Sequence, residues 1–173
     1  FRKFSKVQIE AFGDFPTKEY HFIFQILTHK AFHGVEHYNS TVILLGPSYD
    51  IMNRGGWYED LLGVSCHELY HAWNVKQIRP IEMAPYDYSK ENYTELGYID
   101  EGVTTYFGDK HLFTSGVFNW EQYAKTFNQL LSRHYKNFGV NNYTVAQSSF
   151  DTWLDGYAKG TPGRKGSIYT EGA

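Results

Sequence analysis

The chain has 173 residues, of which 42% are hydrophobic, so it is long enough to form one domain with its own core. Its 16 basic and 19 acidic side chains give a formal net charge of −3, which offers no reason to expect nucleic acid or an anionic membrane as a partner. The chain has a single cysteine, Cys66, so an intrachain disulfide is excluded. The cysteine content does not indicate whether the protein works in an oxidising or a reducing compartment.

The first third of the chain predicts a small sheet. Residues 20–29 (YHFIFQILTH) combine aromatic and β-branched residues in partial alternation, and residues 40–47 (STVILLGP) form a short apolar run closed by Gly-Pro. Both segments are expected to be strands. Residues 34–39 (GVEHYN) lie between them, and we expect this segment at or beside an edge of the sheet.

Helical spacing begins after the breaker at residues 53–56. The stretch 57–75 predicts a helix, and Pro80 ends this element. One stripe of this helix is apolar and a second stripe carries two histidines. The apolar stripe consists of Leu62, Cys66, Leu69 and Trp73, and the other holds His67 and His71.

The rest of the chain predicts further helices. A polar loop at 84–97 precedes helices at 98–113, 119–135 and 145–157, and a Gly-rich flexible loop follows at 158–167. Because the strands come first and the helices afterwards, the predicted fold class is α+β, with N-terminal strands followed by a mainly α-helical part. No apolar run reaches the roughly 18 residues of a membrane span.

The octapeptide HELYHAWN at residues 67–74 carries the strongest chemical signal. His67 and His71, four residues apart, place two imidazoles on one helix face at a separation that suits a zinc ion. Glu68 cannot bind the same metal comfortably, but it can hold a metal-activated water and take its proton as general base. The alternative is a surface helix with solvated histidines.

A catalytic zinc ion needs three protein ligands and one open position. The downstream glutamates Glu82, Glu91, Glu95 and Glu101 are candidates for the third ligand. Glu91 has a spacing from His71 known in other zinc sites, but it lies in the polar loop. Glu101 is favoured because apolar neighbours can pack its helix while its carboxylate projects to the cleft, and a helix holds a ligand more firmly than a loop.

Three segments together resemble the M61 family of metallopeptidases, the glycyl aminopeptidase group: GVEHYNST (34–41), HELYHAWNVKQIRP (67–80) and DEGVTTYF (100–107). They also look like the more distant M1 aminopeptidases. The resemblance extends from about residue 20 to the end of the chain. It implies a thermolysin-like zincin catalytic domain. Residues 1–173 would be a fragment of it, without the β-rich N-terminal and PDZ-like C-terminal neighbours of the family.

The resemblance also implies two further site residues. Glu36 of GVEHY matches the residue that holds the substrate's α-ammonium by a charge-assisted hydrogen bond. Tyr169 of IYTEGA (168–173) matches the tyrosine that donates to the oxyanion, although Glu171 stands where a lysine is usual. His37, next to Glu36 on an extended segment, points the other way and is expected to be structural.

The sequence therefore predicts a zinc-dependent aminopeptidase with one Zn²⁺ per chain, held by His67, His71 and Glu101. We expect it to remove N-terminal residues, small ones such as Gly or Ala, from peptides with a free N-terminus. Cobalt or manganese could occupy the same ligands. The alternatives are a zinc endopeptidase of the same fold and a non-catalytic, peptidase-like binding domain. The compartment and the oligomeric state stay open.

Overall fold

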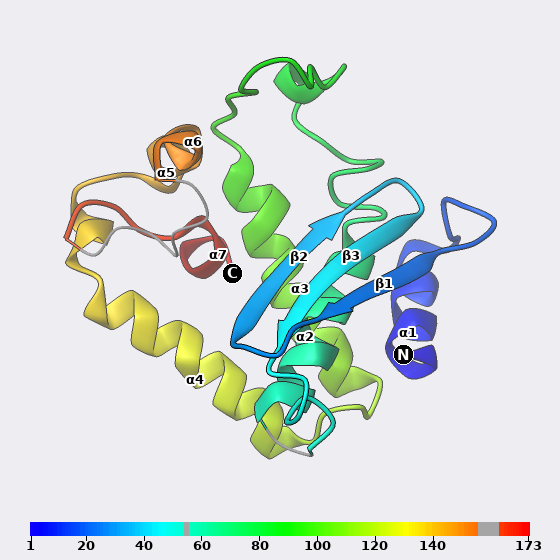
Figure 1. Ribbon diagram of the computed structural model, residues 1–173. Coiled ribbons are helices and arrows are strands. Elements are labelled where there is room, and N and C mark those ends of the chain that lie inside the picture. Colours follow the sequence, from blue (N-terminus) through cyan, green and yellow to red (C-terminus); the bar gives the residue numbers. More distant parts are fainter. Residues whose placement is uncertain (54–55, 156–162) are drawn as a thin grey trace. The chain divides into compact units, whose positions relative to one another are not determined.

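The computed structural model describes residues 1–53, 56–155 and 163–173, and it has a mixed α and β fold with one small sheet (Figure 1). Within the described residues, no helix is both long and apolar enough to cross a membrane. The elements in chain order are α1 Arg2–Phe12, β1 His21–Ile26, β2 Ala31–Glu36, β3 Ser40–Gly46, α2 Gly56–Tyr70, the 3-10 turn η1 Ile81–Met83, the π-helical turn η2 Ile99–Val103, α3 Thr104–Thr114, α4 Trp120–Lys136, the 3-10 turn η3 Phe138–Asn141, α5 Val145–Phe150, α6 Thr152–Asp155 and α7 Ile168–Glu171.

The chain divides into two compact units. The first consists of Phe1–Gln77 and Phe107–Trp120, and the second of Ile78–Tyr106 and Glu121–Ala173. The first unit holds the sheet, in the order β1-β3-β2, with β1 parallel and β2 antiparallel to the central strand β3. β2 is therefore an edge strand. The predicted strands at 20–29 and 40–47 are confirmed, and the segment expected at a sheet edge supplies the end of β2.

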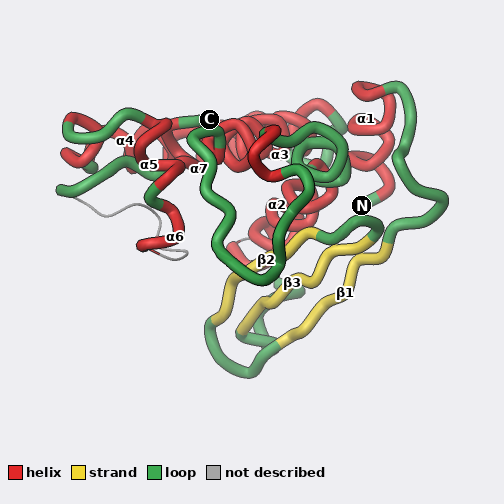
Figure 2. Tube along the Cα trace, turned by 90° about the horizontal axis from the view of Figure 1, so that it is seen from above, coloured by secondary structure: helices red, strands yellow, loops and turns green. Residues whose placement is uncertain are grey.

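The core of the first unit lies between the sheet and α2. The alternate residues Thr41, Ile43 and Leu45 of β3 are buried, as expected for a strand whose one face is covered. Helix α2 contacts β2 and β3, and Figure 2 shows it on one side of the strand layer. The predicted apolar stripe is confirmed, because its members are all buried: Leu62, Cys66, Leu69 and Trp73.

Helix α2 ends earlier than the sequence predicts. The expected helix covers 57–75, whereas α2 ends at Tyr70, and the backbone hydrogen bonds beyond it mix three-residue and four-residue steps. The amide of Trp73 bonds to the carbonyl of Tyr70 at 3.1 Å, a three-residue step. Val75 then has φ 110°, which no residue of a right-handed helix can adopt.

Helix α1 was not predicted from the sequence. Phe4 and Gln8 are fully buried one turn apart, and Gln8 Nε2 donates to the carbonyl of Cys66 at 2.9 Å. The helix ends at Gly13, which has φ 86° and whose amide bonds back into the last turn. A polar residue in the buried stripe hides the helical pattern, so the prediction of strands followed by helices is wrong at its first element.

The second unit is made of short helices and loops. Its elements η2 and α7 contact each other, and α5 contacts both α6 and α7. Ser149 of α5 accepts a hydrogen bond from the amide of Tyr98 at 3.0 Å, which ties α5 to the start of η2. Helix α5 begins with a capping box between Thr144 and Gln147.

The predictions for the later part of the chain have different outcomes. The helix expected at 98–113 exists, but it starts with the π-helical turn η2. The helix expected at 119–135 is confirmed as α4. The segment 145–157 is not one helix, because α5 and α6 are separated at Asp151, and its last two residues lie outside the described ones. The Gly-rich loop at 158–167 is described only from residue 163 onward.

Candidate metal centre

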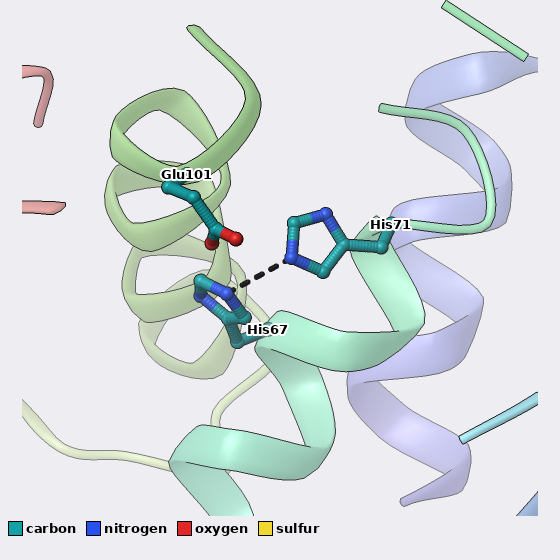
Figure 3. Close-up of side chains that lie close together, drawn as sticks. All are labelled: His67, His71 and Glu101. Atoms are coloured by element: carbon teal, nitrogen blue, oxygen red, sulfur yellow. Dashed lines mark hydrogen bonds between the residues drawn. The ribbon is translucent and has the colours of Figure 1, made fainter. Parts of the chain in front are cut away.

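The two histidines predicted to bind a metal lie one turn apart at the end of α2. His71 is buried, His67 is half-buried, and their Nε2 atoms are 3.0 Å apart. His71 follows the last α-helical residue, yet its amide still donates to the carbonyl of His67 at 3.4 Å. The four-residue spacing therefore keeps its helical geometry, and the two rings point toward each other (Figure 3).

A backbone carbonyl fixes the orientation of His71. Its Nδ1 lies 2.9 Å from the carbonyl oxygen of Asn74, and because a carbonyl can only accept, Nδ1 is the donor. The neutral ring then keeps its lone pair on Nε2, the atom that faces His67. Such a hydrogen bond to the second ring nitrogen is typical of a metal-binding histidine.

The separation of the two nitrogens fits a tetrahedral zinc ion. Two nitrogens bound at about 2.0–2.1 Å lie about 3.3 Å apart, and the observed separation is 3.0 Å. His67, His71 and Glu101 each offer one ligand atom, and these atoms all lie within 4.8 Å of one another (Figure 3). Two imidazoles and one carboxylate form a donor set found in catalytic zinc sites.

The other glutamates considered for the third position lie elsewhere. The carboxylate of Glu82 accepts a hydrogen bond from the hydroxyl of Thr94 at 2.6 Å, which lowers the pKa of that carboxyl. Glu91 and Glu95 are exposed loop residues. The structure therefore groups Glu101, rather than these three, with the histidines. Its role as a ligand stays a prediction.

Glu101 lies in η2, and π-helical turns of this kind are frequent at functional sites. The next residue, Gly102, allows a very close backbone contact, because a Cβ at this position would lie 2.8 Å from the carbonyl oxygen of Gly172. Gly172 directly follows α7, the helix that holds Tyr169. The contact between these two glycines seats α7 against the turn that carries Glu101.

Glu68, the predicted general base, is buried in α2 with 5% of its surface exposed. Its side chain lies against Gly34 of β2, where an added Cβ would fall 2.6 Å from the carboxyl carbon of Glu68. The hydroxyl of Tyr20 donates to the backbone carbonyl of Glu68 at 3.1 Å. Burial, and then the charges of Glu68 and Glu36, raise the pKa of Tyr20.

Glu36 forms an ion pair that was not predicted from the sequence. Its Oε1 accepts a hydrogen bond from Lys76 Nζ at 2.9 Å, and the two side chains are 26% and 17% exposed. No second hydrogen-bond partner of this carboxylate occurs among the described residues. The neighbouring His37 instead has Nδ1 3.2 Å from the carbonyl oxygen of Val35.

Tyr169 lies half-buried in α7, and its role toward an oxyanion stays a prediction. Glu171, which stands where the resembling segment has a lysine, has its own partner. His134 Nδ1 donates to its Oε2 at 2.6 Å. The departure from the lysine pattern is therefore accommodated by a local pair within the second unit.

Cys66 lies next to His67 but has a structural role. It is fully buried, its thiol donates to the carbonyl of Gly108 at 3.2 Å, and its sulfur accepts from Gln8 Nε2 at 3.2 Å. Burial raises the pKa of the thiol well above its usual value, so the thiolate that a metal needs is disfavoured. Its burial agrees with the place of Cys66 in the predicted apolar stripe.

Two comparisons with known proteins find relatives. A family model described as M61 glycyl aminopeptidase matches residues 60–173, which is more than half of the chain. The chain is also similar to the crystal structure of an aminopeptidase N family protein from Idiomarina loihiensis, with a TM-score of 0.89 and 34% identity. That similarity covers 99% of this chain, which spans 30% of the length of the other. No curated protein matches the chain.

Proposed function

Because the chain belongs to the M61 glycyl aminopeptidase family of peptidases, we propose that it is a zinc-dependent aminopeptidase that removes small N-terminal residues, Gly or Ala, from peptides. The observation that carries this proposal is the grouping of His67, His71 and Glu101, with Glu68 adjacent to the first histidine. The substrate is a peptide with a free N-terminus.

Zinc is the metal we propose, because two imidazoles and one carboxylate match its preferred donors and leave one position open. Cobalt or manganese could use the same ligands. The zincin architecture stays a prediction from the family resemblance, as does the place of residues 1–173 as a fragment of a catalytic domain that has β-rich and PDZ-like neighbours.

The proposed reaction is hydrolysis of the first peptide bond. When bound, zinc supplies a Lewis acid that lowers the pKa of a water molecule and polarises the scissile carbonyl. The buried carboxylate of Glu68 accepts the proton of the attacking water as a C–O bond forms. Glu68 then passes this proton to the leaving amine as the C–N bond breaks.

Two further residues would bind the substrate in this scheme. The hydroxyl of Tyr169 donates a hydrogen bond to the oxyanion that develops during attack. The carboxylate of Glu36, at the end of the edge strand β2, accepts the substrate's α-ammonium and so sets the distance from the N-terminus at which cleavage occurs. We call this role of Glu36 the amine anchor.

Metal content and amide hydrolysis test the proposal together. The chain is loaded with zinc, freed of excess, and assayed by elemental analysis and with glycyl and alanyl p-nitroanilides. We expect about one zinc per chain in the parent and its loss or strong weakening in His67→Ala and Glu101→Gln. Glu68→Gln is expected to keep the zinc and lose roughly 10²–10⁴-fold in kcat.

The exposed Glu91→Gln is the matched control for Glu101→Gln, because it makes the same chemical change outside the ligand group. It should retain both zinc and activity. A parent chain that binds no zinc, or a Glu101→Gln variant that binds zinc as well as the parent does, would refute the metal site. Zinc binding without hydrolysis would instead favour a binding domain.

The ion pair between Glu36 and Lys76 favours a second candidate, a zinc endopeptidase of the same fold. If Glu36 serves only as the partner of Lys76, nothing holds the substrate's N-terminus and internal bonds become accessible. Cleavage of one peptide with a free and with an acetylated N-terminus separates the two candidates. The aminopeptidase requires the free amine, whereas the endopeptidase cleaves both.

A further inference from the structure

Lys76 places a positive charge beside the carboxylate of Glu36. The proposed function assigns this same carboxylate to the positively charged α-ammonium of the substrate. Lys76 Nζ lies 2.9 Å from Oε1 of Glu36, and both side chains are mostly buried, at 17% and 26% exposure. Exposed lysine–carboxylate pairs are mobile and strongly screened, but burial to this extent reduces both effects. The pair therefore presents a carboxylate that is already partly neutralised.

The backbone before Lys76 has an unusual conformation and is tied to His71. Val75 has φ 110°, and it is the one described non-glycine residue with positive φ. Such a conformation is rare for a β-branched residue and persists only where neighbouring contacts impose it. Two contacts to His71 flank it: the carbonyl of Asn74 accepts from His71 Nδ1 at 2.9 Å, and the amide of Lys76 donates to the carbonyl of His71 at 3.1 Å.

The turn formed by Asn74, Val75 and Lys76 thus performs two tasks. It orients the imidazole of His71, and it directs the Lys76 side chain to Glu36, forty positions earlier in the chain. A lysine on a freely moving loop would vacate the carboxylate whenever a competing cation arrived. The hydrogen bond from the Lys76 amide to His71 limits how far Lys76 Nζ can move from Glu36.

We propose that Lys76 is a built-in counter-ion that weakens the capture of free amines by Glu36 and thereby sets the affinity of the amine anchor. The inference rests on the proposed function, because it requires Glu36 to receive the α-ammonium. Because Lys76 holds Oε1 of Glu36, the second oxygen, Oε2, is the one that would receive the α-ammonium.

Two opposing effects follow from this arrangement. An ammonium on Oε2 would lie about 6 Å from Lys76 Nζ, which is shorter than the Debye length of about 8 Å at physiological salt, so the two cations repel each other. Lys76 also restricts the rotation of the Glu36 side chain, which favours binding. The gain from ordering one short side chain is smaller than the repulsion between two charges in a partly buried site, so the net effect of Lys76 is to weaken amine binding.

The test uses two inhibitors that differ in a single amino group. Glycine hydroxamate and acetohydroxamate share the metal-binding hydroxamate, and the former alone carries an amine. The ratio of their inhibition constants therefore reports the amine anchor with metal binding cancelled. It is measured on the zinc-loaded chain and on Lys76→Met, Lys76→Gln and Lys76→Arg, each checked for zinc content and for its circular dichroism spectrum.

We expect Lys76→Met and Lys76→Gln to bind glycine hydroxamate about tenfold or more tightly than the parent, with acetohydroxamate unchanged. Lys76→Arg, which keeps the charge, should leave the ratio near its parent value. Equal or weaker binding of glycine hydroxamate by both neutral variants would overturn the inference. Two variants are included because the glutamine retains a hydrogen-bonding group that helps to preserve the fold.

Glu36→Gln distinguishes failure of this inference from failure of the proposed function. If the inhibitor ratio of the parent is unaffected by Glu36→Gln, then Glu36 is not the amine anchor and the proposed exopeptidase mechanism fails. If Glu36→Gln reduces the preference for the amine but the neutral Lys76 variants do not increase it, the anchor stands and the counter-ion role of Lys76 is wrong.

Discussion

Gly34 of β2 lies directly against the carboxylate of Glu68, with no space between them for even a methyl group. A Cβ at position 34 would fall 2.6 Å from the carboxyl carbon of Glu68 and 2.9 Å from its Cγ. The edge strand therefore forms one wall around the predicted general base. This wall consists of backbone, which cannot rotate away as a side chain can.

Gly34→Ala is expected to displace the Glu68 carboxylate and so reduce kcat by roughly ten- to a hundredfold, because proton transfer depends on hydrogen-bond geometry. Zinc content should be unchanged. The measurement is steady-state hydrolysis of a glycyl anilide. Gly63→Ala is the control, since a Cβ there meets nothing within 4 Å and the change should preserve kcat.

The same substitution in a chain that already carries Glu68→Gln makes this prediction specific. If Gly34→Ala acts through Glu68, it should cause little further loss of activity in a Glu68→Gln chain, whose base is already gone. A loss of the same size in both backgrounds would show that Gly34 acts through some other part of the site.

Gly102→Ala is expected to move α7 away from η2 within the second unit. The added Cβ would meet the backbone of Gly172, and backbone cannot be repacked cheaply. We expect a loss of about 1–3 kcal/mol in the free energy of unfolding and a fall in kcat, because Glu101 and Tyr169 both lie on the displaced elements.

Gly172→Ala places a Cβ against the carbonyl oxygen of Tyr98, 2.8 Å from that of Ile168 and 3.0 Å from the Cα of Gly102. It should reproduce the effect of Gly102→Ala, and the double variant should lose less than the sum of the two. Chemical denaturation and anilide hydrolysis measure the two effects. Additive losses would argue that the two glycines act independently.

Val75→Gly is expected to stabilise the fold by about 1 kcal/mol, because glycine adopts a positive φ without the strain of about 1–3 kcal/mol that a side chain incurs, less its greater cost in backbone entropy. Thermal or urea unfolding measures the change. Val75→Ala, which keeps a Cβ, is the control and should not be stabilised in this way.

His111 gives the fold a defined response to acid. It is buried, with the rings of Tyr70 and Phe107 beside it, and burial, followed by the charge of Lys110, lowers its pKa below 6.5. Below pH 6.5 the unfolded chain therefore takes up more protons at this residue than the folded chain does. The stability contributed by neutral His111 is present above this pH and is lost as the pH falls.

The free energy of unfolding should accordingly fall from about pH 7.5 to about pH 5.5, and His111→Phe should reduce that slope. Urea denaturation at several pH values gives the slope directly. The exposed His29→Gln is the control and should leave the slope unchanged. An identical slope in His111→Phe and the parent would show that other groups dominate the acid response.

Local patterns predicted much of the fold. The stripe that includes Cys66 and Leu69 is buried because helical spacing brings these residues onto one face, and the alternation around Ile43 marks the central strand. The early end of α2 was not predictable in this way. The segment that follows includes Val75 with φ 110°, a conformation that a β-branched residue rarely adopts and that residue spacing does not reveal.

In the candidate site, too, local features could be predicted from the sequence and contacts between distant residues could not. The spacing of His67 and His71 is local, and the structure groups them with Glu101, whose role as a ligand stays a prediction. The pairing of Glu36 with Lys76 joins residues forty positions apart and leaves no periodic signal in either segment. Such an ion pair depends on how the strand and the turn pack against each other. Composition and residue spacing carry no information about that packing.

The glycine contacts described above bear on how freely this sequence can vary. Gly34, Gly102 and Gly172 have no group that can take part in a reaction, yet each lies where a single added carbon would strike Glu68 or a backbone. In a library of all single substitutions selected for activity, these three positions should be as intolerant as the metal ligands. Gly63 in the middle of α2 should accept replacement. The positions that tolerate no substitution would then mark close backbone packing as well as reactive groups.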